Sequence, residues 1–260
     1  MRAGERERGD GLTRSPALEL TGVTRAFGGL VAVSDVTLSI RERERQAVIG
    51  PNGAGKTTLF NLITGQLPVS SGRIVLFGED VTGLPIHQRV ARGMARTFQI
   101  TNLFPRLTVW DNVMLAAQGL SRTKFNMLRP VSRRGELAGR VERALEDVGL
   151  RDKAGVATRE LSHGEQRQLE IALGLVSRPK LLLLDEPAAG LSAAERVTMA
   201  GLIRGLPDDL TLMLIEHDMD LALGLVDWVT VLQDGSVIVA DRPDAIRRNE
   251  QVQEVYLGAG

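Results

Sequence analysis

The chain contains no cysteine among its 260 residues, which excludes disulfides and thiolate metal sites. Its three histidines, His87, His163 and His217, are too dispersed in the sequence to suggest a metal motif. The 32 basic and 32 acidic residues cancel, so no net charge recruits nucleic acid or an anionic membrane surface. The apolar runs, such as residues 181–184, are far shorter than the roughly 20 residues that span a bilayer. We therefore expect a protein that is soluble by itself, in a reducing compartment such as the cytosol.

The length of the chain allows one large α/β domain, or a core domain with a smaller appended one. Residues 1–11 are charged and glycine-rich and no apolar segment follows them, so they predict neither a secretory signal nor a core element. We expect residues 1–16 to form a disordered tail and residues 17–258 to form a single folded domain.

The hydrophobic patterns alternate between strand and helix types. Alternation of apolar and polar residues at 18–23 and 36–40 predicts strands of an antiparallel edge sheet. Continuous apolar runs at 181–184 and 212–215 are typical of parallel strands buried on both faces. Further patterns predict helices at 109–117 and 137–148 and a hairpin whose strands cover 228–232 and 237–239. A mainly parallel sheet with a helical insertion at about residues 100–178 is the expected architecture.

A phosphate-binding loop is the most specific local signal. Residues 50–58 match the pattern G-x-x-x-x-G-K-[ST] and directly follow an apolar strand-like stretch. Glycines at three loop positions allow successive N–H groups to converge on phosphate oxygens, Lys56 adds a positive charge near the β- and γ-phosphates, and the Thr57 hydroxyl is placed to ligate Mg²⁺. The sequence therefore predicts a P-loop NTPase core that binds ATP through Gly50, Pro51, Asn52, Gly53, Ala54, Gly55, Lys56, Thr57 and Thr58.

Phosphoryl transfer also needs a metal holder and a group that positions the attacking water. Asp185 ends an apolar run of four leucines and is the candidate Mg²⁺ ligand, and Glu186 beside it is the candidate general base. His217 follows the neighbouring apolar strand and is the candidate group that senses the γ-phosphate. Gln99 lies in a turn where its amide could contact Mg²⁺ and water. The alternative is that the acids are turn residues and that the histidine is structural.

A second anion site is predicted at Leu161-Ser162-His163-Gly164-Glu165-Gln166-Arg167, where a serine and a glycine open an apolar-faced helix. Together, in this order, the phosphate loop, Gln99, this segment, Asp185-Glu186 and His217 resemble the ATP-binding subunit of ATP-binding-cassette (ABC) transporters. The resemblance covers roughly residues 17–258.

The resemblance implies that two cassettes associate head to tail, so that Ser162, Gly164 and Glu165 of one approach the ATP held by Lys56 of the other. It further implies that Phe27 stacks on adenine, that Gln99 links the site to the membrane partner and that His217 is a switch histidine. A core aromatic is the alternative for Phe27. The sequence departs from the usual family pattern at His163 (glycine), Glu165 (glutamine) and Ser192 (aspartate), which puts the rate and the coupling between sites in doubt.

Within the family, the segments 96–99, 103–109, 184–191, 215–219 and 254–258 look most like the subunit that energises import of branched-chain amino acids. That kinship implies two transmembrane permease subunits, an extracytoplasmic solute-binding protein that acts indirectly, and a peripheral position on the cytoplasmic face of the inner or plasma membrane. An apolar docking surface for the permease is expected at Phe104, Leu107, Val109 and Trp110, with ordinary core as the alternative. The basic stretch at 121–134 is interpreted as a docking or lipid-facing patch, or as a solvated loop between helices.

Other functions stay open at the level of sequence. Importers of urea or short amides look close, and Leu161-Ser162-His163-Gly164 leans slightly toward them. A soluble ABC-type ATPase that acts on nucleic acid or ribosomes would be expected to carry a long coiled-coil insertion or two cassettes, and no nucleic-acid partner is predicted here. A small-molecule kinase would leave the segment around Ser162 and His217 unexplained.

Overall fold

The structure is a computed structural model that describes residues 15–97, 103–119 and 131–257. The chain divides into two compact units, one formed by residues 1–92 with 209–260 and the other by residues 93–208. Within the described ranges, no helix is both long enough and apolar enough to cross a membrane. Gln99 and most of the basic stretch at 121–134 lie outside the described residues.

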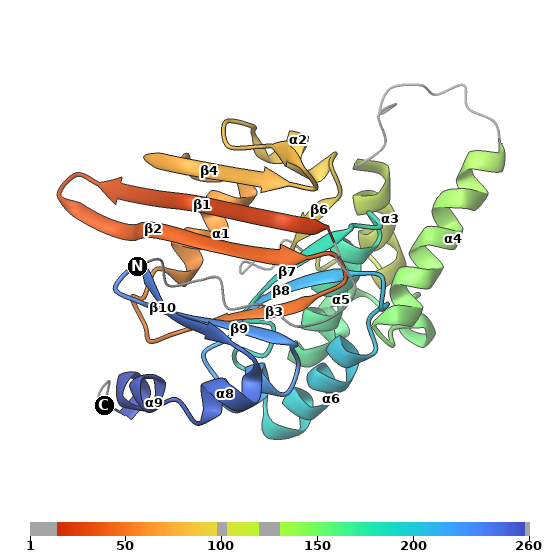
Figure 1. The fold of residues 1–260 in the computed structure, drawn as a ribbon. Coiled ribbons are helices and arrows are strands. Elements are labelled where there is room, and N and C mark those ends of the chain that lie inside the picture. The colour runs from red at the N-terminus through yellow and green to blue at the C-terminus, as the bar shows by residue number, and fades with distance from the viewer. Residues whose placement is uncertain (1–14, 98–102, 120–130, 258–260) are drawn as a thin grey trace. The chain divides into compact units, whose positions relative to one another are not determined.

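The first unit contains an antiparallel sheet, drawn from red to yellow in Figure 1, with the order β2-β1-β4-β5. Its strands are β1 (Pro16–Phe27), β2 (Leu30–Arg41), β4 (Ser71–Leu76) and β5 (Glu79–Asp80). The predicted antiparallel edge sheet is confirmed, but β1 and β2 are much longer than the apolar alternation indicated, and β1 begins at Pro16, inside the expected tail. Cross-strand pairing, for example between Phe27 and Leu30, extends the strands through residues without a regular pattern.

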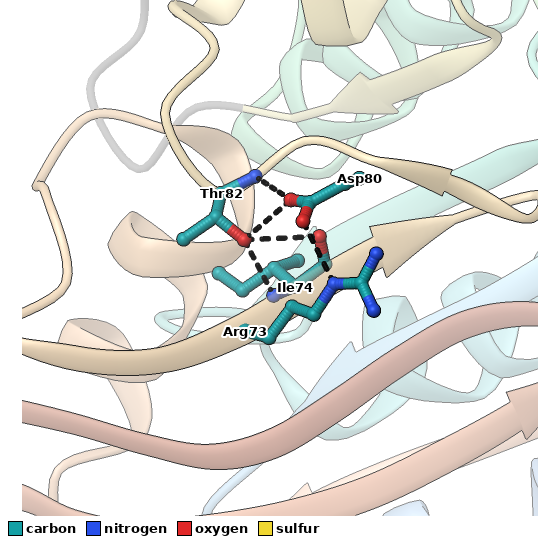
Figure 2. Close-up of polar contacts among 4 residues, drawn as sticks. All are labelled: Arg73, Ile74, Asp80 and Thr82. Carbon is teal, nitrogen blue, oxygen red and sulfur yellow. Dashed lines mark hydrogen bonds and ion pairs between the residues drawn. The ribbon is translucent and has the colours of Figure 1, made fainter.

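The end of β5 and the turn that follows it are held against β4 by a network of polar contacts (Figure 2). Asp80 Oδ2 accepts a hydrogen bond from Arg73 Nε at 2.7 Å, and its Oδ1 accepts hydrogen bonds from the Thr82 amide and hydroxyl at 3.0 and 2.7 Å. These bonds, Thr82 first, lower the pKa of the Asp80 carboxyl to about 2. The Thr82 hydroxyl in turn accepts from the Ile74 amide at 2.9 Å, which fixes the turn against the strand.

The same unit holds a second group of strands. In it β3 (Arg45–Ile49) lies between β8 (Thr211–Ile215) and β9 (Trp228–Gln233), parallel to both. The predicted hairpin is confirmed: β9 pairs antiparallel with β10 (Ser236–Asp241), and Asp234 and Gly235 between them have φ values of 48° and 78°. All residues of β8 are buried, and so are those of β3 after Arg45. For β8, the continuous apolar run at 212–215 predicted this, as is typical of parallel strands covered on both faces.

In the part of the first unit that the structure describes, the helices are α1 (Lys56–Thr64), α2 (Ile86–Val90), α7 (Met219–Leu223), α8 (Pro243–Arg247) and α9 (Glu250–Leu257). Ala47 and Ile49 of β3 share an apolar core with Ile246 and Val252 of the last two helices. The fully buried Arg89 of α2 donates to the carbonyls of Leu62, Ile63, Thr82 and Leu84 at 2.6–3.0 Å. It thereby satisfies carbonyls at the C-terminal end of α1, which no further helical turn could satisfy.

The second unit contains a parallel strand pair and most of the longer helices. β6 (Met94–Arg96) is parallel to β7 (Leu181–Asp185), and the helices are α3 (Val109–Gly119), α4 (Val131–Asp147), α5 (His163–Leu175) and α6 (Ala193–Arg204). Short 3₁₀ helices cover Arg151–Lys153 and Thr158–Glu160. The buried Asn112 of α3 ties the helix to neighbouring segments through bonds to the Phe104 and Thr108 carbonyls and the Thr158 hydroxyl. The fold is therefore α/β, with parallel strands in the core, an antiparallel sheet and a helical insertion, as predicted.

Candidate functional site

The phosphate loop connects β3 to α1 and is shaped by its glycines. Gly50, Gly53 and Gly55 have φ values of 150°, 83° and 95°, which side chains rarely adopt. A Cβ built on Gly50 would lie 2.1 Å from the Leu232 carbonyl oxygen, and one on Gly55 would lie 2.5 Å from the Ala32 carbonyl oxygen. At Gly53 a Cβ would meet nothing within 4 Å. Two of the loop glycines are thus required by the protein's own backbone, whereas the third borders open space.

Lys56, the first residue of α1, is buried, and its side chain folds back onto the phosphate loop. Its Nζ donates to the carbonyls of Gly50 and Pro51 at 2.6 and 2.9 Å. Gly55 is the N-cap of α1 and has no side chain with which to cap the first N–H groups, which suits them to an anion. The Thr57 side chain is exposed on the first turn. These features fit the predicted binding of a triphosphate.

His217 lies at the same edge of the strand group as the phosphate loop. Val48 of β3 pairs with Ile215 of β8, and the carboxyl ends of parallel strands meet at one edge. The His217 side chain is 57% exposed, so it is not a core histidine. The structure thus brings this sequence-predicted residue to the loop's edge of the sheet, in the first unit.

Asp185 is the last residue of β7, in the second unit, and Glu186 follows it directly. Asp185 is buried, and its Oδ2 accepts a 2.5 Å bond from Arg96 Nη2 in an ion pair whose side chains are 8% and 0% exposed. Its Oδ1 is also buried and has no hydrogen-bond partner in the described part of the chain. Glu186 has a φ of 49°, which is uncommon for a residue with a side chain and often marks a functional position. The interpretation of the two acids as ordinary turn residues does not explain a buried carboxylate.

The Asp185 carboxylate is a donor group that suits Mg²⁺. Magnesium in nucleotide sites uses one or two protein oxygens together with substrate phosphates and waters, and it prefers carboxylate and hydroxyl ligands. Among the described residues, no group of three or more histidines, cysteines or acids is arranged to hold a metal ion. An unsatisfied buried carboxylate oxygen on Asp185 is the feature that fits a cation arriving with the nucleotide.

The segment that begins α5 forms a complete capping box. Ser162 is the N-cap, its hydroxyl accepts from the Glu165 amide at 3.2 Å, and Glu165 Oε2 accepts from the Ser162 amide at 3.0 Å. Glu165 also forms an ion pair with Lys153, and the hydrogen bond from Lys153 is the main cause of the lowered pKa of the Glu165 carboxyl. The unusual glutamate at this position therefore stabilises the helix start, and its contact with nucleotide stays a prediction.

A residue that the sequence analysis missed lies against this segment. Glu195 Oε1 accepts from the Gly164 amide at 3.2 Å, while its Oε2 accepts from the Ser192 amide and hydroxyl at 3.0 and 2.7 Å. A Cβ on Gly164 would lie 2.9 Å from Glu195 Oε1, so a larger residue there would require the end of the Glu195 side chain to shift. The pattern S-x-x-E at 192–195 is a readable capping box, but its link to α5 has no sequence signal.

The structure also bears on two predicted contact residues or surfaces: Phe27, expected to stack on adenine, and the apolar docking surface that includes Phe104 and Val109. Phe27 is 43% exposed at the end of β1, with the Arg25 guanidinium 4.5 Å from its ring centroid, so the core-aromatic interpretation is wrong. Phe104 is 56% exposed, but Val109 is fully buried. Val109 therefore belongs to the core and cannot contribute to a docking surface. Gln99 lies outside the described residues.

The family described as ABC transporter matches residues 33–189, which include the phosphate loop, the α5 start and Asp185-Glu186. The chain therefore belongs to the ABC transporter family and is an ATP-binding, ATP-hydrolysing cassette, as the resemblance of its motifs predicted.

Particular relatives are similar over almost the whole length. The chain is 40% identical to the high-affinity branched-chain amino acid transport ATP-binding protein BraF of Pseudomonas aeruginosa, over 94% of this chain and 98% of that protein. It is 42% identical to the corresponding protein LivG of Salmonella typhimurium and 39% identical to LivG of Escherichia coli, with the same coverage.

Solved structures agree with the fold. A nucleotide-free ATP-binding cassette from an ABC transporter superposes with a TM-score of 0.81 at 26% identity, covering 93% of this chain and 99% of that one. A dimeric ATP-binding cassette in a post-hydrolysis state, bound to ADP and Pi, superposes with a TM-score of 0.70 at 25% identity, covering 87% of this chain and 98% of that one.

Proposed function

We propose that this chain is the ATP-hydrolysing subunit that energises import of branched-chain or similar hydrophobic amino acids through a pair of membrane permeases. The observation that carries this proposal is the similarity, at 39–42% identity and over 98% of their length, to proteins described as branched-chain amino acid transport ATP-binding proteins. The cassette works as a peripheral subunit on the cytoplasmic face of the inner or plasma membrane.

Lys56 and the loop amides bind the β- and γ-phosphates, while the exposed Phe27 stacks on the adenine. Glu186 accepts a proton from the attacking water, and its φ of 49° fixes where the side chain leaves the strand. His217 and Gln99 act on the γ-phosphate and the attacking water. When bound, Mg²⁺ neutralises charge that develops on the phosphates, and Thr57, Gln99 and Asp185 are the residues that would hold it.

A second cassette completes the assembly in this proposal, either another copy of this chain or a similar protein. Its Ser162, Gly164 and Glu165 approach the ATP held by Lys56 of the first, in a head-to-tail dimer. Support comes from the dimeric, ADP- and Pi-bound cassette to which the chain is similar. The permeases contact the cassette at an exposed apolar surface that includes Phe104, and a solute-binding protein outside the membrane delivers the cargo.

The second candidate within the same class is import of urea or short amides, favoured only by the segment Leu161-Ser162-His163-Gly164. Relatives named for branched-chain amino acids outweigh that single segment. The relatives described above are not named for a soluble ABC-type ATPase that acts on nucleic acid or ribosomes.

A pull-down from detergent-solubilised membranes, with ATP and Mg²⁺ present, tests the assembly. Recovery of two multi-span permeases is expected, and the ligand of the companion binding protein then names the cargo. The Lys56→Ala variant serves as the nucleotide-binding control. Recovery of soluble partners or nucleic acid alone would leave the ATPase in place and overturn the role in transport.

A further inference from the structure

The ion pair between Arg96 and Asp185 differs from the exposed ion pairs of the molecule. Arg96 Nη2 lies 2.5 Å from Asp185 Oδ2, and the two side chains are only 8% and 0% exposed. The pair between Arg73 and Asp80 in Figure 2 is comparable in length, at 2.7 Å, but its side chains are 62% and 47% exposed. An exposed pair is screened by water and contributes little, whereas a buried carboxylate depends on its partner.

Both partners of the buried pair are fixed by backbone. Arg96 is the last residue of β6, whose register on β7 places it opposite Leu183, two residues before Asp185. The Thr97 amide continues the pairing with a 3.0 Å bond to the Leu183 carbonyl. The guanidinium therefore reaches the carboxylate from a strand that is paired with β7, so it can hold one orientation of the Asp185 side chain.

The two carboxylate oxygens of Asp185 differ in their hydrogen bonding. Oδ2 is occupied by Arg96, while Oδ1 is buried and has no hydrogen-bond partner within the ranges that the structure describes. Buried acceptors are nearly always satisfied, so an unsatisfied one calls for a ligand. Divalent cations such as Mg²⁺ bind through carboxylate oxygens, so a cation that arrives with the nucleotide, or a water that it binds, fits this oxygen.

We propose that Arg96 is a positioning residue for Asp185: its guanidinium holds one carboxylate oxygen and keeps the other available to the divalent cation. This inference rests on the proposed function, because it needs Asp185 to bind the metal. Partners that orient a ligating carboxylate typically change metal affinity by about 10- to 100-fold when they are removed.

The test measures how much Mg²⁺ strengthens nucleotide binding by the full-length protein. The Kd of a fluorescent non-hydrolysable ATP analogue is measured once in the presence of EDTA and once in saturating Mg²⁺. The Kd in EDTA divided by the Kd in Mg²⁺ reports how much the metal strengthens binding. For Arg96→Met we expect that ratio to fall by about tenfold or more, with the EDTA value unchanged. Arg96→Lys keeps the charge and should recover part of the ratio, and Arg73→Met is the matched control that should not alter it.

A double-variant cycle separates positioning from general damage. If Arg96 acts through Asp185, Arg96→Met should have no further effect in an Asp185→Asn background. A wild-type ratio in both Arg96 variants, a larger ratio in Arg96→Met, or an undiminished effect in the Asp185→Asn background would each overturn the proposal. If Arg96→Met does not fold, Arg96→Lys in the same cycle decides. If Asp185→Asn alone leaves the ratio unchanged, the metal role of Asp185 fails as well.

Discussion

The phosphate loop and the end of β7 are built by different means. The loop is shaped by backbone: Gly50 and Gly55 have positive φ values, and a Cβ on either would overlap a carbonyl oxygen. The end of β7 is shaped by side chains, because Asp185 is held by Arg96, a residue 89 positions away in the sequence. A site made by backbone conformation leaves a glycine pattern that can be read in the sequence, whereas a site made by distant side chains leaves no such pattern.

The largest expected effect is on turnover, and two variants distinguish the chemical role of Glu186 beside β7 from ATP binding at the phosphate loop. Glu186→Gln should bind ATP as before but lose turnover by about 10²- to 10⁴-fold, because the amide cannot accept the proton of the attacking water. Lys56→Ala should instead weaken ATP binding itself. Nucleotide affinity and phosphate release are measured for both variants. Wild-type turnover in Glu186→Gln would remove the proposed base.

The backbone account of the loop is tested by two matched alanine substitutions. Gly55→Ala should lower the free energy of unfolding by about 2–5 kcal/mol, since it combines an unfavourable φ with overlap on the Ala32 carbonyl. Gly53→Ala carries only the φ penalty of about 1–2 kcal/mol, because its Cβ would meet no atom within 4 Å. Denaturant unfolding without nucleotide measures both. Equal losses would show that the overlap is relieved by a small shift of the loop.

The helix that follows the phosphate loop depends on a side chain at its other end, where Arg89 donates to the last carbonyls of α1. Arg89→Met should cost about 2–4 kcal/mol of unfolding free energy, because it leaves carbonyls at the end of α1 without their charged donor. Burial lowers the pKa of the Arg89 guanidinium, but the group remains charged near neutral pH. Thermal and denaturant unfolding should agree. An unchanged stability would mean that the carbonyls find other donors.

The cap of α6 should have a smaller effect. Ser192→Ala removes the N-cap hydroxyl that accepts from the Glu195 amide and donates to the Glu195 carboxylate, at a cost of about 1 kcal/mol. Ser192→Asp restores a cap of the family's usual type and should recover that stability. If Ser192→Ala is as stable as the wild type, the capping box contributes nothing measurable.

The smallest effect is a pH dependence in the exposed turn of Figure 2. The folded-state pKa of Asp80 is lowered from 3.8 to about 2, first by the Thr82 hydroxyl. A depressed carboxyl pKa gives stability that is present above the unfolded pKa and is lost as pH falls through the folded value. Stability measured from pH 5 to about pH 2 should therefore decline less in Asp80→Asn than in the wild type. Parallel curves for the two proteins would contradict this role of Asp80.

The sequence predicted the elements and most of the site chemistry where a local pattern exists. Apolar runs before Asp185 and His217 predicted buried parallel strands, and both strands are present. The lengths of β1 and β2 could not be predicted, because cross-strand pairing continues beyond the apolar alternation. Neither could the contacts of Glu195 with Gly164 or of Arg96 with Asp185, because no local pattern encodes which distant side chain approaches a helix start or a strand end. The roles of the site residues toward ATP stay predictions.

Uptake of radiolabelled leucine tests whether this chain energises amino-acid import. It is measured in cells of the native host that lack this gene and carry either the wild-type chain, Lys56→Ala or Glu186→Gln, with labelled urea as the comparison solute. We expect that deletion lowers leucine uptake, that only the wild-type chain restores it, and that urea uptake is unaffected. Leucine uptake that is unchanged by the deletion, or restored equally by Glu186→Gln, would contradict the account.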